Sequence, residues 1–401
     1  MRRTVARIGV VAALALSMGV AAVNAPSARA EEPGLVSAAR ANNDEMNYAI
    51  NLAGTNPEDL QRALALVPGA GGAALASYPE IGTFFAQSAT PSFAPDLAAA
   101  LRAAGISIHS IGPTRVAPVL YYERVELPTD KKDEAPAPQS GGAGGLNSMR
   151  DETASAAPTE ANEEIFNWGA VAMHAREAEA VNVKRAPVTV AVVDSGVEDT
   201  HPDLEGRVDT ERSVKCSVNG VATQDFYGWR DEFYHGTHVA GIIAANHNDI
   251  GIDGIAPQAT IVAIQATNDN RLIYPEYVTC AFMWAASHGV DVVNNSYSMD
   301  PWVYWSPTDP EQAAGLEAAT RSIKYAQDKG LAVIAAAGNE GVDIDNPWID
   351  NGSPTDVPTP TKNRAVEGSI RVPSMLDGVA QVSAVGQAYN VKPGLSLGRA
   401  E

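Results

Sequence analysis

The chain has 401 residues with 45% hydrophobic content, so it can bury a sizeable core and is long enough for two folded units. Its 48 acidic and 28 basic residues give a formal net charge of −20. Nucleic acid and anionic lipid surfaces both require a basic footprint, so this charge argues against either of them as a partner.

The first 30 residues are typical of a secretory signal peptide. Three early arginines precede an apolar run from Ile8 to Val23, and Ala28-Arg29-Ala30 provides an A-x-A cleavage site. A single membrane helix is the alternative, but the apolar run is short and is followed by small residues and a proline. We therefore expect a secreted, extracellular protein with no membrane partner.

Residues 31–127 predict a small α+β unit. The segment Asn56-Pro57-Glu58-Asp59 can cap a helix, and a second helix is expected near Pro95–Ala104. The alternation in Ile106-Ser107-Ile108 indicates a strand.

Residues 128–162 are rich in Lys, Asp, Glu, Pro, Ser and Gly and lack hydrophobic periodicity, which predicts a flexible linker.

Residues 163–401 then alternate short apolar runs with helical patterns, which predicts an α/β domain with a doubly wound parallel sheet. The expected strands are Val188–Val193, Thr260–Gln265, Val290–Asn294 and Leu331–Ala336, and the expected helices are His238–Ala245, Tyr277–His288 and Glu311–Asp328. Ligands of such sheets bind beyond the carboxyl ends of the strands, where Asp194, Asn294 and Asn339 fall.

The chain contains two cysteines, Cys216 and Cys280. In an oxidising compartment two cysteines more often pair than stay free, so we expect a disulfide between them. Such a bridge would add roughly 4 kcal/mol to the stability on a chain-entropy estimate. The alternative is two separate buried thiols, because the sequence does not give the distance between them.

Asp194 and His235 are candidates for acid–base chemistry. Asp194 follows a buried strand, where its carboxylate could orient a histidine or could merely cap the next turn. His235 precedes a helix of small residues, whose positive dipole end disfavours the imidazolium and keeps the ring neutral, as a general base requires. A metal pair with His238 is the competing idea, but no third ligand lies at a metal-binding spacing, and we expect His238 to pack into the helix.

Three segments, in this order along the chain, resemble the subtilisin family of serine proteases: Val192-Val193-Asp194-Ser195-Gly196, His235-Gly236-Thr237-His238-Val239-Ala240-Gly241 and Ala336-Ala337-Gly338-Asn339-Glu340-Gly341. The resemblance covers roughly residues 163–386. It implies a subtilisin-like fold and a serine endopeptidase that acts on proteins or peptides without an organic cofactor. It also implies that Asp194 orients His235, that His235 is the general base, and that Asn339 donates to the oxyanion. A turn asparagine that tolerates a left-handed backbone is the alternative for Asn339.

The same resemblance extends to the parts of the chain around this core. It implies that residues 31–127 are a propeptide that assists folding and inhibits the peptidase domain of its own chain. We expect this precursor to be a monomer.

The segment Asn294-Asn295-Ser296-Tyr297 resembles the family segment whose backbone pairs with an extended substrate. We therefore expect Asn294, Ser296 and Tyr297 to take part in substrate binding. The family usually has glycine after this segment, whereas this chain has Ser298 and then an aromatic loop, so its subsite preference is open.

Asp203 and Asn248 resemble the ligands of the family's calcium site. A carboxylate, an amide oxygen and loop carbonyls suit a hard cation, so a structural calcium ion is possible. The alternative is that both residues are solvated loop residues.

The family's nucleophile lies in a Gly-Thr-Ser segment, and the 401 residues contain no such segment. Ser374, Ser383 and Ser396 lack this context, so we expect the polypeptide as given to be nearly inert. One interpretation is a secreted endopeptidase precursor whose serine-bearing C-terminal part is absent from this sequence. The other is a catalytically inactive peptide-binding or regulatory protein, which would have no chemical need for an aspartate, a base and an oxyanion donor together.

Overall fold

The computed structural model describes residues 44–119, 168–181, 186–224, 227–343 and 349–385. The expected signal peptide and the expected linker at 128–162 therefore lie outside the described residues. Within the described ranges, no helix combines the length and the apolar character needed to cross a membrane.

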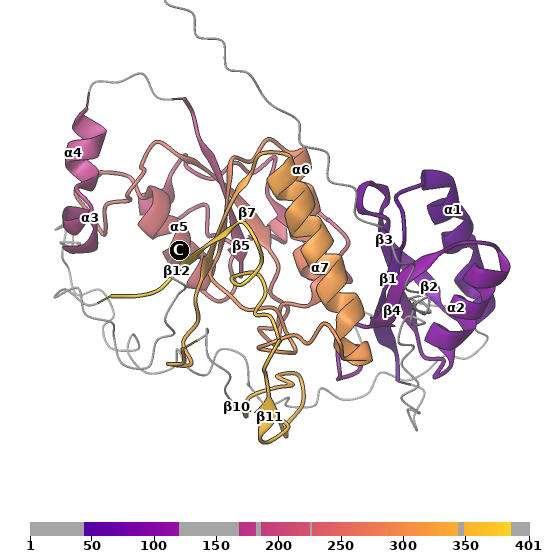
Figure 1. The fold of residues 1–401 in the computed structure, drawn as a ribbon. Helices are drawn as coiled ribbons and strands as arrows, with labels where there is room; N and C mark the ends of the chain where they lie inside the picture. The colour runs from indigo at the N-terminus through magenta and orange to yellow at the C-terminus, as the bar shows by residue number, and fades with distance from the viewer. Residues whose placement is uncertain (1–43, 120–167, 182–185, 225–226, 344–348, 386–401) are drawn as a thin grey trace, which may run out of the picture. The chain divides into compact units, whose positions relative to one another are not determined.

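The N-terminal domain is built on a four-stranded antiparallel sheet in the order β2-β3-β1-β4. Its strands are β1 (Met46–Leu52), β2 (Ala73–Tyr78), β3 (Thr83–Ser88) and β4 (Ile108–Pro113), and its helices are α1 (Pro57–Leu66) and α2 (Phe93–Ala103), with short 3-10 turns at Pro68–Ala70 and Pro79–Ile81. Figure 1 shows α1 and α2 together beside this sheet. The α+β arrangement expected from the sequence is therefore present, although the first predicted strand segment, 106–108, begins only at Ile108.

Helix α1 begins where the sequence predicted, because its first turn is capped locally. The Asn56 side chain accepts a hydrogen bond from the Glu58 amide at 3.0 Å, and Pro57 occupies a position where its missing N–H costs nothing. The two helices bury Leu60, Phe93 and other apolar side chains against Ile50 and its neighbours on β1. The domain thus has a core of its own.

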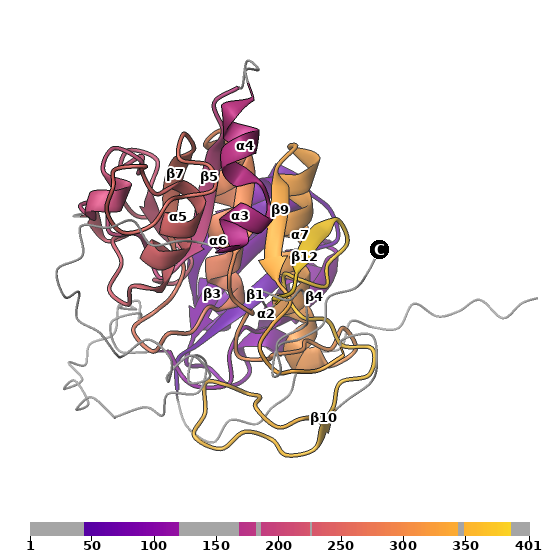
Figure 2. The same cartoon turned by 90° about the vertical axis from the view of Figure 1, so that its left-hand side faces the viewer.

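The second domain contains a six-stranded sheet in the order β12-β9-β8-β5-β7-β6, and every neighbouring pair is parallel. Its strands are β5 (Thr189–Asp194), β6 (Val214–Lys215), β7 (Thr260–Gln265), β8 (Val292–Asn295), β9 (Ala332–Ala336) and β12 (Val379–Val382). Figure 2 shows β9 and β12 side by side. The main helices are α5 (His235–Ala244), α6 (Pro275–Ser287) and α7 (Pro310–Asp328), with short helices α3 (Trp168–Ala172) and α4 (Ala175–Ala180), a 3-10 turn at Pro202–Leu204, and a small antiparallel pair of β10 (Ile349–Asp350) and β11 (Arg364–Ala365).

Helices cover both faces of the central part of this sheet, which explains why β5 and β7 are nearly continuous buried runs, whereas β9 and β12 keep exposed residues (Figure 1). Val190 and Val192 on β5 pack in one cluster with Ala240 of α5. Their neighbours on the strand point to the opposite face, where Val193 packs in a second cluster with side chains of α6 and α7. The predicted α/β domain with a doubly wound parallel sheet is confirmed, and the carboxyl ends of β5, β8 and β9 meet at one edge.

Candidate active site

Asp194 and His235 lie in direct contact at the carboxyl edge of the sheet. Asp194 is the last residue of β5, with an exposed fraction of 3%, and His235 is the first residue of α5. The His235 Nδ1 atom lies 2.7 Å from Asp194 Oδ1, a hydrogen-bond distance. Asp194 Oδ1 also accepts from the backbone N–H of Ser195 at 2.7 Å, which fixes the orientation of the carboxylate.

Gly236 allows helix α5 to approach the end of β5 this closely. A Cβ atom at position 236 would lie 2.1 Å from the carbonyl oxygen of Gly196 and 3.0 Å from the Cβ of Asp194. Because neither neighbour is a flexible side-chain end, a larger residue would have to push the helix away from the strand. The small residue next to His235 is therefore part of what holds the histidine against the aspartate.

Asp231, which no sequence motif identified, organises the loop that precedes His235 and the first turn of α5. Its Oδ2 accepts hydrogen bonds from the backbone N–H and the hydroxyl of Thr237 at 2.8 and 2.6 Å. Its Oδ1 accepts from the Ser195 hydroxyl at 2.9 Å, and that hydroxyl in turn accepts from the Gly236 amide at 3.0 Å. The available signal was an acidic residue four positions before His235, since carboxylates are favoured near helix N-termini.

The hydrogen bond to Asp194 raises the pKa of His235 above its ordinary value. Burial of the ring opposes this change, and the charges of Asp194 and Asp231 add to it. The helix dipole predicted a lowered pKa and a neutral ring, and that direction is wrong. A carboxylate at 2.7 Å interacts with the imidazole more strongly than the partial charge at the end of a ten-residue helix does.

Asn339 follows β9 on an exposed loop at the same edge of the sheet. The left-handed Gly338 precedes it, with φ of 116°. Because β9 is parallel to β8 and β8 to β5, the segments after Asn295 and Ala336 leave the sheet on the side where Asp194 ends β5. The structure therefore places Asn339 at the same edge of the sheet as Asp194.

The expected substrate-binding residues begin inside β8 and continue beyond it. Asn294 is half-buried and donates to the Ser296 hydroxyl at 3.0 Å. Burial raises the pKa of the Tyr297 hydroxyl, and the nearby charge of Asp194 adds to this rise. Tyr297 thus lies close enough to Asp194 to sense its charge, which brings this segment next to the Asp194–His235 pair.

His238 is exposed, so the expectation that it packs into the helix is wrong. Position 238 lies about one turn after His235 and is not among the buried residues of α5. The metal pair has no support in the described part of the chain, which contains no cluster of three or more His, Cys, Asp or Glu side chains that could hold a metal ion.

Asp203 and Asn248 come together, but in a network of hydrogen bonds. The Asn248 amide lies 3.4 Å from Asp203 Oδ1, and the backbone N–H of Ile252 donates to Asp203 Oδ2 at 3.2 Å. The loop wraps so tightly that a Cβ atom at Gly251 would lie 2.1 Å from that same Oδ2. The two side-chain oxygens suit a hard cation, although both carboxylate oxygens already have protein partners.

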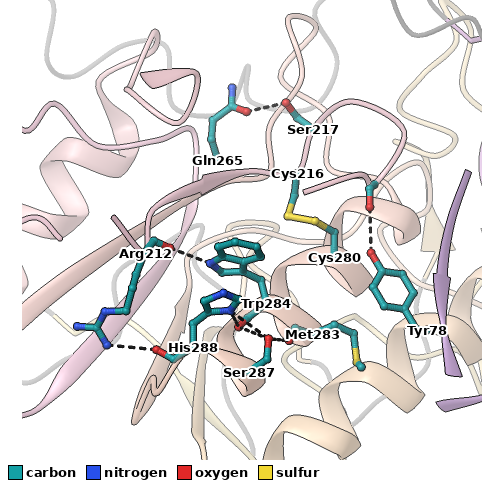
Figure 3. Close-up of a disulfide and its surroundings, with 11 residues drawn as sticks. Tyr78, Arg212, Cys216, Ser217, Gln265, Cys280, Met283, Trp284, Ser287 and His288 are labelled. Atoms are coloured by element: carbon teal, nitrogen blue, oxygen red, sulfur yellow. Dashed lines mark hydrogen bonds between the residues drawn. A yellow bond between two sulfur atoms is a disulfide. The ribbon is translucent and has the colours of Figure 1, made fainter. Parts of the chain in front are cut away.

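The disulfide between Cys216 and Cys280 is present, as expected, with the Cα atoms 5.8 Å apart. It joins the segment after β6 to the middle of α6, and Figure 3 shows Ser217 beside it donating to Gln265. One turn further along α6, the Trp284 indole stacks on the His288 ring at 3.6 Å and donates to the Arg212 carbonyl at 2.7 Å. The bridge therefore ties the buried segment after β6 to a well-packed helix.

Curated proteins with similar sequences include fervidolysin and several subtilisins. Over 190 residues the chain is 34% identical to fervidolysin of Fervidobacterium pennivorans, an alignment that covers 45% of this chain and 25% of that protein. Over 229 residues it is 31% identical to subtilisin NAT of Bacillus subtilis subsp. natto, covering 57% of this chain and 51% of that protein. The chain thus spans between a quarter and about half of the length of these relatives.

A solved structure supports the fold, and a family model identifies the family. The epidermin leader peptide processing serine protease (EpiP) of Staphylococcus aureus superposes with a TM-score of 0.61 at 20% identity, over 88% of this chain and 72% of that chain. At this identity the likeness concerns the fold alone. Residues 185–395, more than half of the chain, match the model of the subtilase family. The chain therefore belongs to the subtilase family of serine proteases.

Proposed function

We propose that the chain is part of the precursor of a secreted serine endopeptidase that hydrolyses peptide bonds by an Asp-His-Ser mechanism. The observation that carries this proposal is the hydrogen bond of 2.7 Å between Asp194 and His235 at the carboxyl edge of the sheet. In this proposal the nucleophilic serine belongs to a Gly-Thr-Ser segment outside these 401 residues.

In the proposed mechanism, Asp194 holds His235 in one tautomer. Because Nδ1 donates its proton to the carboxylate, Nε2 is left as the basic nitrogen. Nε2 takes the proton of the serine hydroxyl as the acyl-enzyme forms and later delivers it to the leaving amine. The buried, already oriented carboxylate stabilises the imidazolium that exists between these two steps.

Asn339 would stabilise the oxyanion of the tetrahedral intermediate, and the segment after β8 would bind the substrate. Both hydrogen-bonding edges of β8 are already paired, one with β5 and the other with β9. Backbone that could pair with a substrate therefore begins beyond Asn295. Ser296 and Tyr297 can offer this backbone to an extended peptide, as strand addition requires. An amide donor at position 339 is worth about a factor of 10² to 10³ in turnover, a magnitude that was measured in subtilisin itself.

The test is to extend the chain with the serine-bearing C-terminal segment of a related subtilase and to measure labelling by a serine-directed phosphonate. We expect the extended chain to be labelled and to cleave peptides, and the 401-residue chain to take up no label. His235→Ala should abolish labelling, whereas His238→Ala, at an exposed position on the same helix, is the matched control and should be labelled normally. Full turnover in a folded His235→Ala variant would refute the assignment.

A catalytically inactive protein that binds peptides at the same edge of the sheet is the second candidate. Its Asp194–His235 pair would then be a structural feature. An extended chain that folds, binds peptides and takes up no phosphonate would favour this alternative over the endopeptidase.

We also propose that residues 31–127 are the propeptide of this enzyme and inhibit it within a monomeric precursor. Two observations support this proposal: the N-terminal domain has a core of its own, and it shares apolar contacts with α7. Ala49 and Phe85 from the N-terminal sheet pack in one buried cluster with Ala314 and Ala318. Inhibition would require that the domain also limits access to the substrate segment.

A calcium ion at Asp203 and Asn248 is the remaining proposal. If it binds, the Asp203 carboxylate must give up its contact with the Asn248 amide, whose oxygen would then turn toward the ion. We expect 1 mM calcium, roughly the concentration that an extracellular calcium site of weak affinity requires, to raise the unfolding temperature relative to a chelator. Asp203→Asn should remove this difference, and an equal unfolding temperature with and without calcium in the parent protein would exclude the site.

A further inference from the structure

A buried ion pair joins the N-terminal domain to the peptidase domain. Arg115 follows β4, and Glu276 lies in the first turn of α6. Their side chains are 1% and 0% exposed, and Arg115 Nη2 donates to Glu276 Oε1. The guanidinium also lies over the Tyr274 ring, 3.9 Å from its centre. Two opposite charges from different domains are thus removed from water together.

Further polar side chains surround this pair. Asn47 donates to Glu276 Oε1 at 2.8 Å and to Asn219 Oδ1 at 3.2 Å, and Gln87 donates to Asn47 Oδ1 at 3.0 Å. All of these side chains are buried. Within this interface, then, Glu276 and Asn219 of the peptidase domain meet donors from two strands of the N-terminal sheet.

The disulfide holds the two peptidase-side acceptors in fixed relation. Cys216 lies three residues before Asn219, and Cys280 lies one helical turn after Glu276. The neighbouring Gly220 carbonyl accepts from the Tyr78 hydroxyl of the N-terminal domain at 2.9 Å (Figure 3 shows Tyr78 near the disulfide). The bridge therefore fixes the distance between the loop and the helix that together contact the N-terminal domain.

A second carboxylate holds the next two residues of the chain. Asp356 Oδ2 accepts from the backbone N–H groups of Val116 and Ala117, at 2.8 and 2.9 Å. Three consecutive residues, 115–117, are thus bound by two acidic side chains from separate elements of the peptidase domain. The following residue, Pro118, has no N–H to offer.

We propose that Glu276 and Asp356 form a recognition site for an arginine side chain followed by two backbone N–H groups. In the precursor this site is occupied by Arg115–Ala117, and it determines which N-terminal domain the peptidase domain accepts. The inference rests on the proposed propeptide function of residues 31–127. It goes further by naming the chemistry of the bound segment.

The physical basis is that a buried charge tolerates only a partner of matching charge and geometry. The positive end of α6 favours a carboxylate at position 276 but does not replace the guanidinium. If a foreign N-terminal domain lacked the arginine, Glu276 would be buried without its counter-charge, which is strongly unfavourable. Removal of Glu276 would likewise leave the guanidinium of Arg115 buried without a counter-charge.

The experiment uses the chain without its signal peptide and with a specific protease site inserted in the linker at 128–162. After cleavage, the rate at which the N-terminal fragment dissociates from the peptidase domain is measured by fluorescence of a dye on that fragment. Arg115→Met and Glu276→Gln should each accelerate dissociation by about 100-fold or more, because each leaves one buried charge unpaired. The double variant should dissociate more slowly than either single variant, since it buries no unpaired charge.

Arg62→Gln is the matched control, because Arg62 forms an exposed ion pair with Asp59 on the same domain. This variant should dissociate within about twofold of the parent. Dissociation within threefold of the parent, in both folded single variants, would overturn the inference, and a double variant that is the fastest of all would overturn it too. Phosphonate labelling of the extended chain is scored separately, so failure of the proposed catalytic function and failure of this recognition site give different results.

Discussion

At the scale of single residues, the protonation of His235 is controlled by the aspartate beside it. The hydrogen bond that His235 donates to Asp194 is the largest cause that raises the pKa of His235, ahead of the smaller effect of Asp231. Because the pKa in the folded state lies above that in the unfolded state, the pair stabilises the fold fully at low pH. This stabilisation is lost as the pH rises through the raised pKa.

The first prediction is that Asp194→Asn lowers the pKa of His235 more than Asp231→Asn does. The reason is that Asp194 contributes both a hydrogen bond and a charge, whereas Asp231 contributes a charge alone. A histidine-selective NMR titration of the 401-residue chain measures both values, with His235→Gln to assign the signal. In the extended enzyme, activity should rise with pH through this raised pKa, above the ordinary histidine value of about 6.5. Equal titration midpoints of His235 in the parent protein and in Asp194→Asn would contradict the conclusion that Asp194 raises the pKa of His235.

The second prediction concerns Asp300, a buried carboxyl group that no motif identified. Burial raises the pKa of Asp300 to about 7, and the nearby Asp356 adds to the rise. The unfolded value is about 3.9, so between these two pH values the folded state binds more protons than the unfolded state, and stability falls as the pH rises. Above pH 7, Asp300 is ionised in the folded state, so the free energy of unfolding is reduced by the full cost of burying its charge.

Asp300→Asn should therefore make the protein more stable above pH 7, by at most about 4 kcal/mol, with a smaller gain at pH 5. The amide can keep the contacts of the acid: its oxygen can accept from the Ile273 amide, now at 2.8 Å, and its nitrogen can donate to the Thr355 hydroxyl, now at 2.6 Å. Urea unfolding at pH 5 and pH 8 measures the difference. Parallel stability profiles of parent and variant across this range would show that Asp300 is not protonated in the folded state.

Some of these residues could be predicted from the sequence and others could not. The difference is how far apart along the chain the contacting residues lie. Asp194 and His235 lie in local motifs whose residue types reveal the chemistry. Asp300 meets Thr355 across 55 residues, and Arg115 meets Glu276 across 161 residues. The chain offers no local pattern for such pairs, because the partner is defined by the packing of whole domains.

At the scale of secondary-structure elements, the order of strands and helices in the peptidase domain was predictable, while their ends were less so. Apolar runs such as that of β9, which recur between helical patterns, predicted the strands, although Ala332 and Ala336 at the ends of β9 are exposed. Helix α5 begins at His235, three residues earlier than predicted. The pattern of small residues gave no reason to start it before His238, and contacts of Asp231 with Thr237 and of Gly236 with β5 decide the start.

The third prediction is that Gly236→Ala disrupts the contact between α5 and β5. A Cβ atom there would lie 2.1 Å from the Gly196 carbonyl oxygen, so the helix must move and His235 must shift away from Asp194. We expect a loss of about 1 to 3 kcal/mol in stability and a lower pKa of His235. Chemical denaturation and the NMR titration measure these two effects.

Gly241→Ala is the matched control on the same helix. Its Cβ atom would lie 3.4 Å from Ile252, an ordinary contact, and alanine favours a helix more than glycine does by roughly 1 kcal/mol. This variant should be as stable as the parent or slightly more stable. If both substitutions had the same effect, close approach at Gly236 would not be what positions the helix.

At the scale of the whole molecule, the sequence indicated two folded units but could not indicate how much polar surface they bury together. The four-stranded sheet contributes Asn51, which donates to the Ala314 carbonyl at 2.9 Å, and α7 contributes Arg321, which donates to the Leu52 carbonyl at 2.8 Å. These contacts supplement the apolar cluster around Phe85 and Ala318. Each involves a backbone carbonyl, so no residue type at the accepting position could have signalled it.

The fourth prediction is that the peptidase domain folds poorly without this surface. We expect residues 128–401 to refold from denaturant with a lower yield than residues 31–401, because α6 and α7 would have to form with Glu276 and Ala318 uncovered. The yield is measured as the fraction of soluble protein with native circular dichroism after dilution. A chain that lacks only residues 31–43, outside the described part of the N-terminal domain, is the control and should refold like the longer chain. Equal yields for residues 128–401 and 31–401 would mean that the N-terminal domain is not required for folding, and its role would then have to be sought in inhibition alone.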